Sequence, residues 1–82
     1  MDDVWLVSCN TPDPATASTL AALLVETAAA ACVTIMPACE SIYRWKGATE
    51  RASEIPLMIK TTKANYPAVE SLIRANHPYE VP

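Results

Sequence analysis

The segment CVTIMPACESIYRWKG, residues 32–47, predicts a long β-strand that is interrupted near its middle and closed by a turn. Pro37 cannot donate a ladder hydrogen bond, so we expect a bend or bulge there. Gly47 is the only glycine in the chain and supplies the positive φ that a hairpin turn needs. The second half of the segment alternates between two faces, one of which carries Ser41, Tyr43 and Trp45.

The strand that returns from this hairpin is predicted over residues 53–62, SEIPLMIKTT. Pro56 has no N–H to donate to a neighbouring strand, so we expect this residue at a bulge or facing an unpaired edge. Ahead of the hairpin, residues 4–10, VWLVSCN, form a short valine-rich run, which is typical of a central strand buried on both faces. One face of the return strand carries Ile55, Leu57 and Ile59.

Two helices are predicted between these strands. Asp13 can accept from free N–H groups at a helix start, and Pro14 suits the first helical position. An apolar stripe then runs along one helix face into the alanines at 28–31, through Leu20, Leu23, Leu24, Thr27 and Ala31. Asn65 can cap a second helix that ends before Pro78.

Residues 79–82, YEVP, begin a last strand, and the order of elements is then βαββαβ. This order predicts one ferredoxin-like α+β domain over residues 1–82, with two helices on one face of an antiparallel sheet. We expect the first and return strands to be central and the last strand to lie beside the first. Tyr43 and Trp45 then form an apolar strip that a chain of this size cannot cover itself, which predicts a partner subunit.

The composition excludes several classes of protein. Lys and Arg number 6 against 9 Asp and Glu, the net charge is −3, and no basic cluster is present to bind nucleic acid. The apolar run at residues 4–7 is too short for a signal peptide or a membrane span. Three cysteines without paired spacing predict no disulfide framework. We therefore expect a cytoplasmic protein that binds neither nucleic acid nor membrane.

Cys9 closes the first strand, and His77, the only histidine, comes just before the last one. Antiparallel neighbours bring the end of one strand beside the start of the other, so these side chains can meet. Cys9 has two interpretations, as a metal ligand or as a small buried side chain. His77 likewise suits either a ligand or a helix-end residue that interacts with the carbonyl dipole.

The same pair offers little as a catalytic centre. A thiolate and an imidazolium at Cys9 and His77 could act as a nucleophile, with Lys60 or Glu80 assisting. The chain has no glycine loop for phosphates, no HExxH and no CxxC, and it shows no third group that would orient the pair. We expect no catalytic residues and no enzyme activity.

Four segments of the chain resemble the CutA family of divalent-cation tolerance proteins. They are CNTPD at 9–13 and, in order after it, AACVTIMPACESIYRWKG, SEIPLMIKTT and HPYEVP. The match covers nearly the whole chain. The resemblance implies a ferredoxin-like fold and a tight homotrimer, similar in shape to the PII signalling trimers. Within it, long hairpins, here carrying Tyr43 and Trp45, reach onto neighbouring subunits. It also implies a role in tolerance to copper and other divalent cations.

The resemblance further implies copper ligands, namely a cysteine at the end of the first strand and two consecutive histidines before Pro-Tyr. Cys9 matches the cysteine and His77 the second histidine, whereas Asn76 stands in place of the first. An amide oxygen is a hard ligand that suits Cu(I) poorly, so two good ligands remain. The chain also ends at Pro82, whereas the family continues into a further C-terminal segment.

Two functions follow as expectations. The first is weak, exchangeable binding of copper or a related divalent ion by Cys9 and His77 in a non-enzymatic homotrimer. The alternative is a PII-like regulatory or scaffold trimer that holds a small ligand or a partner protein in clefts between subunits.

Overall fold

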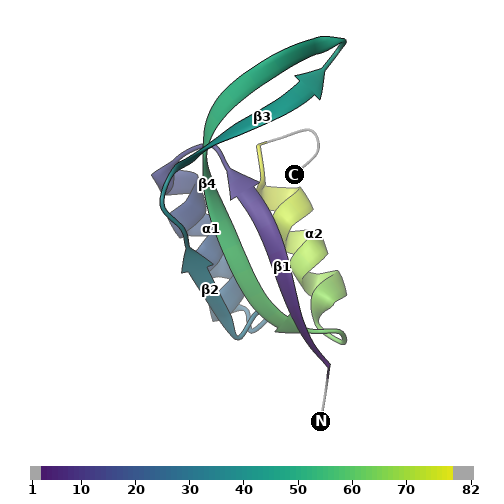
Figure 1. Ribbon diagram of the computed structural model, residues 1–82. Helices are drawn as coiled ribbons and strands as arrows, with labels where there is room; N and C mark the ends of the chain where they lie inside the picture. Colours follow the sequence, from purple (N-terminus) through teal and green to yellow (C-terminus); the bar gives the residue numbers. More distant parts are fainter. Residues whose placement is uncertain (1–2, 79–82) are drawn as a thin grey trace.

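A computed structural model describes residues 3–78, and Figure 1 shows both helices on one side of a four-stranded sheet. This confirms the predicted α+β, ferredoxin-like arrangement. The last predicted strand, residues 79–82, lies outside the described residues. The elements in chain order are β1 Val4–Thr11, α1 Pro14–Glu26, β2 Cys32–Ile35, β3 Cys39–Trp45, β4 Ala48–Thr62 and α2 Tyr66–Asn76.

Strand β4 is the central strand of the sheet. On one side it pairs antiparallel with β1, from Val4↔Thr62 to Thr11↔Ile55, and on its other side it pairs antiparallel with β2. The central position predicted for the return strand is confirmed. The strand is longer than the predicted 53–62 because its first part, from Ala48, pairs with β3.

The break predicted at Pro37 is confirmed as a bulge between β2 and β3. Ile35 lies opposite Leu57 and Cys39 opposite Glu54, so residues 36–38 face only residues 55–56. The β2–β3 side has one extra residue here. Odd-numbered side chains therefore point to one face of the sheet in β2 and to the opposite face in β3. Pro56 lies in the part of β4 that faces this bulge, as expected for a proline inside a sheet.

The hairpin of β3 and β4 extends beyond the part of the sheet that the helices cover (Figure 1). Its turn has positive φ at both central residues, 51° at Lys46 and 80° at Gly47, which confirms the role predicted for the glycine. The hairpin carries three exposed apolar side chains, namely Ile42, Tyr43 and Trp45.

The core lies between the two helices and the β1–β4–β2 sheet. Leu57 and Ile59 of β4 are fully buried against apolar side chains from both helices. Val4 and Leu6 are 64% and 61% exposed, so the prediction that the first strand is buried on both faces is wrong for the described chain. The reason is that both helices cover the same face of the sheet. The buried residues that the helices contribute include Leu20, Leu24, Val69 and Ile73.

Helix α1 ends at Glu26, so its predicted continuation through residues 28–31 is wrong. Ala28 takes the left-handed conformation with φ 62°, and its N–H donates to the Val25 carbonyl, as at many helix ends. The chain then turns, and the Ala31 N–H donates to the carbonyl of Lys60 in β4. The small alanine side chains therefore make a tight return to the sheet.

The two helix starts differ. Asp13 caps α1 as predicted, because its Oδ1 accepts from the Thr16 N–H at 2.7 Å. Asn65 occupies the cap position of α2 but makes no side-chain cap bond. Its main-chain carbonyl accepts from the N–H groups of Ala68 and Val69 instead.

We expect Leu24→Ala to lower the free energy of unfolding by about 2 to 5 kcal/mol, because this fully buried side chain would leave a cavity between α1 and the sheet. Denaturant unfolding followed by circular dichroism measures the loss. Val25→Ala, at the neighbouring and 44% exposed position, is the control and should change stability by less than about 0.5 kcal/mol. Equal losses in the two variants would contradict this core.

Candidate functional site

The end of α2 carries His77 against the end of β1. His77 follows the last helical residue, and its N–H donates to the Ile73 carbonyl at 2.8 Å, which completes the final turn. Its backbone is extended, with φ −95° and ψ 135°, as expected before Pro78. The imidazole therefore projects from a helix end toward Asn10, near the end of β1.

One main-chain oxygen connects His77 and Cys9. His77 Nε2 lies 2.5 Å from the Asn10 carbonyl oxygen, and Cys9 Sγ lies 3.8 Å from the same oxygen. A carbonyl only accepts hydrogen bonds, so the contact places the ring proton on Nε2. The structure thus brings the thiol and the imidazole together at one acceptor.

Both side chains are buried. Cys9 is 6% exposed and His77 is 8% exposed. Burial raises the pKa of the Cys9 thiol, and the negative charge of Glu54, itself a buried residue, raises it further. Cys9 is therefore a protonated thiol at neutral pH. A nucleophilic cysteine needs the opposite shift, so this environment does not favour the thiolate and imidazolium pair.

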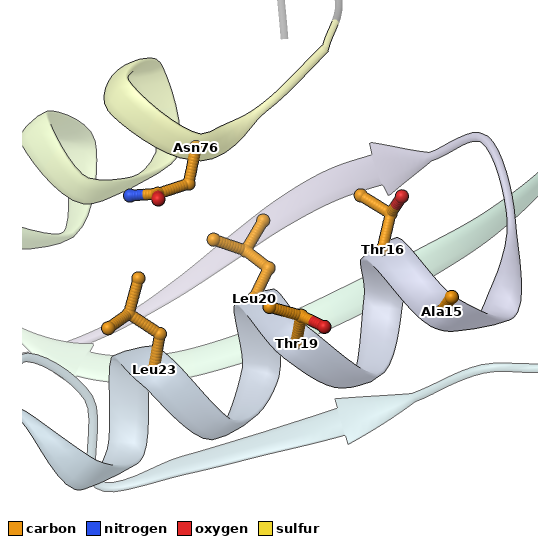
Figure 2. Close-up of a pocket in the computed structure, with 6 residues that line it drawn as sticks. All are labelled: Ala15, Thr16, Thr19, Leu20, Leu23 and Asn76. Atoms are coloured by element: carbon orange, nitrogen blue, oxygen red, sulfur yellow. The ribbon is translucent and has the colours of Figure 1, made fainter.

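Asn76 points away from this pair. Its Nδ2 donates to the Leu72 carbonyl at 2.8 Å, one turn back along α2. Its amide faces α1 across a shallow groove (Figure 2), and the volume of this groove is about 260 Å³. Asn76 therefore does not join Cys9 and His77. The other residues lining this groove are Ala15, Thr16, Thr19, Leu20 and Leu23.

The other two cysteines, and the two residues considered as catalytic assistants, lie elsewhere. Cys32 on β2 and Cys39 on β3 are exposed free cysteines. Lys60 lies opposite Cys32, away from the end of β1, and Glu80 is outside the described residues. Within residues 3–78, no three side chains of His, Cys, Asp or Glu gather where they could hold a metal ion. Neither helix of this region is long and apolar enough to cross a membrane.

Two components of the site were not found from the sequence. The Asn10 carbonyl is a main-chain group, which every residue carries, so no side-chain pattern indicates it. Glu54 acts through its negative charge near Cys9, and no local sequence pattern indicates that the two residues are close. Thr11 fixes this end of β1 by donating from Oγ1 to the Ile55 carbonyl at 2.7 Å.

Comparison with known proteins gives the family. A sequence model described as CutA1 divalent ion tolerance protein matches residues 5–82. The chain belongs to the CutA1 family. The divalent-cation tolerance protein CutA of Pectobacterium atrosepticum is 39% identical over 80 residues, which cover 98% of this chain and 73% of that protein.

Solved CutA1 structures share the fold. The CutA1 divalent cation tolerance protein from Thermus thermophilus has a TM-score of 0.91 at 40% identity, and the match covers 100% of this chain and 78% of that one. The PII-like protein CutA from Nostoc sp. PCC 7120 has a TM-score of 0.83 at 35% identity, and the match covers 92% and 70%. The CutA resemblance and the ferredoxin-like fold predicted from the sequence are confirmed.

We expect Cys9 to react with N-ethylmaleimide more slowly than Cys32 or Cys39 in the folded protein at pH 7, because only Cys9 is buried. Each unit by which a thiol pKa is raised lowers its thiolate fraction about tenfold. Replacing the nearby carboxylate in Glu54→Gln should speed the reaction at Cys9, since it removes one cause of the raised pKa. Mass spectrometry of quenched samples measures each site, and the unfolded protein, in which all three should react alike, is the control. Faster reaction at Cys9 than at Cys32 would contradict the described environment.

Proposed function

We propose that this CutA1 chain is a non-enzymatic, cytoplasmic homotrimer that binds copper, or a related divalent ion, exchangeably through Cys9 and His77. The observation that carries the proposal is the convergence of Sγ and Nε2 on one carbonyl oxygen. Family membership supports a role in tolerance to divalent cations.

The chemistry of the two donors fits such an ion. Thiolate and imidazole are both ligands of copper and zinc. Binding requires Cys9 to lose its proton and Nε2 to leave the Asn10 carbonyl, and each change opposes binding. The site is therefore suited to weak and exchangeable loading.

The same features support a non-enzymatic role. Cys9 has a raised pKa and is held as a thiol, and the ring proton of His77 is directed at a backbone oxygen. Free cysteines, two of them exposed, suit the reducing conditions of a cytoplasm.

Exposed apolar surface supports the homotrimer. Tyr43 and Trp45 are 46% and 47% exposed on a hairpin that projects from the body of the protein (Figure 1). Val4 and Leu6 lie on the sheet face opposite the helices and are more exposed still. Each aromatic ring can bury about 150 to 250 Å² against a partner. Copies of the chain that exchange hairpins would cover both surfaces.

A second function is supported by one comparison. The Nostoc structure that shares this fold is described as a PII-like protein, which favours a regulatory or scaffold trimer with a ligand or partner in clefts between subunits. In that case the pair of Cys9 and His77 would be structural, and the hydrogen bond from His77 to the Asn10 carbonyl would fasten α2 to β1.

Copper titration separates the two functions. We expect Cys9→Ser and His77→Ala each to weaken copper binding by about tenfold or more, because each removes one of two side-chain ligands. Isothermal titration calorimetry measures the affinities. Cys32→Ser is the matched control, since it removes an exposed thiol that lies outside the site. Unchanged affinity in both site variants would discard metal binding at this pair and favour the PII-like function.

The assembly is tested at the hairpin. We expect the wild-type protein to have the mass of a trimer by light scattering after size-exclusion chromatography. Trp45→Glu should release monomers, because it would place a charge in the proposed subunit contact. Val25→Glu changes an equally exposed apolar residue on α1 and should leave the trimer intact. A monomeric wild-type protein would contradict the assembly.

A further inference from the structure

The main-chain carbonyl of Asn10 is the point at which the candidate site converges. It accepts from His77 Nε2 at 2.5 Å, and Cys9 Sγ lies 3.8 Å away as a weak second donor. Two hydrogens, one from a thiol and one from an imidazole, are thus directed at one oxygen.

The sheet leaves this oxygen available to side chains. Asn10 lies opposite Pro56 in the ladder of β1 and β4. The Pro56 carbonyl accepts from the Met36 N–H on the β2 side. Asn10 and Pro56 are therefore a non-hydrogen-bonded pair, and the Asn10 carbonyl points away from β4. The ladder continues by one more pair, Thr11 with Ile55, and then β1 ends.

We propose, resting on the metal-binding function above, that the Asn10 carbonyl oxygen is the third protein ligand of the bound ion. The ion takes the place of the two hydrogens that now point at this oxygen. Cys9 releases its proton to solvent, and the ring of His77 exchanges its Nε2 proton for one on Nδ1. The net change is one proton released for each ion bound.

The observed distances are close to those of a shared ion. Metal bonds of about 2.0 to 2.3 Å to nitrogen, oxygen and sulfur place two ligands of one ion about 3 to 4 Å apart. The separation of 3.8 Å from Sγ to the oxygen lies within this range, and that of 2.5 Å from Nε2 is shorter by an amount that a small rotation of the imidazole removes. The oxygen belongs to a paired strand, so it needs no reorganisation to bind.

The third ligand also sets the class of ion. Cys9 and His77 alone are a soft pair that suits Cu⁺, whereas a carbonyl oxygen is a hard ligand. A set of sulfur, nitrogen and oxygen favours Cu²⁺ or Zn²⁺ over Cu⁺. Within residues 3–78 no three side chains of His, Cys, Asp or Glu gather around one point, and the third ligand proposed here is a backbone atom.

Pulsed electron paramagnetic resonance on the Cu²⁺-loaded protein tests the ligand directly. The protein is prepared with asparagine labelled with ¹³C at the main-chain carbonyl, which labels residues 10, 65 and 76. We expect a ¹³C hyperfine coupling together with the ¹⁴N coupling of an imidazole. Asn10→Ala in the same labelled medium keeps a carbonyl at residue 10 but carries no ¹³C there, so the ¹³C coupling should be lost.

The other outcomes separate this inference from the proposed function. Copper that shows the imidazole coupling and loses affinity in Cys9→Ser, but shows no ¹³C coupling, would overturn the carbonyl ligand and leave metal binding at Cys9 and His77 standing. A ¹³C coupling that persists in Asn10→Ala would place the ion at another asparagine and overturn the inference. Copper bound only as the silent Cu⁺ ion would overturn the preference for a divalent ion. Affinity unchanged in both Cys9→Ser and His77→Ala would overturn both proposals.

Discussion

Strand β4 is the constraint on which the rest of the described chain depends, because every other strand in residues 3–78 pairs with it. Its first half pairs with β3, and its second half pairs with β1 and β2. A slip of one residue would turn Leu57 and Ile59 from the helix side to the opposite face. Since these side chains are fully buried beneath both helices, core packing fixes the register of β1, β2 and β4. The two-residue turn at Lys46 and Gly47 fixes that of β3.

This register also builds the candidate site. Cys9 lies opposite Leu57 and shares its buried face, whereas the carbonyl of Asn10, opposite Pro56, points away from β4. Helix α2 supplies the remaining group because its length is matched to the sheet. Tyr66 at its start packs against Trp5, with ring centroids 5.2 Å apart, and the residue after its last turn reaches the end of β1. The meeting of thiol and imidazole is therefore a consequence of strand register and helix length.

The sequence patterns succeeded where the signal was local and failed where it was not. Gly47 and Pro37 impose backbone conformations that any fold must accommodate, so the hairpin and its bulge were predictable. The alanines at 28–31 have high helix propensity, and only their tertiary pairing with β4 shows that the helix stops earlier. The meeting of Cys9 and His77 followed from strand order, but the oxygen between them has no sequence signal of its own, because every residue carries a carbonyl.

Strand β4 connects the hairpin to the candidate site. The ladder of β3 with β4 ends at Cys39 opposite Glu54, and the next two residues of β4 lie opposite the last two of β1. Glu54 is thus the point at which the exposed hairpin joins the buried sheet, and its charge contributes to the raised pKa of the Cys9 thiol. The exposed hairpin and the carboxylate that acts on the Cys9 thiol are therefore carried by one continuous strand.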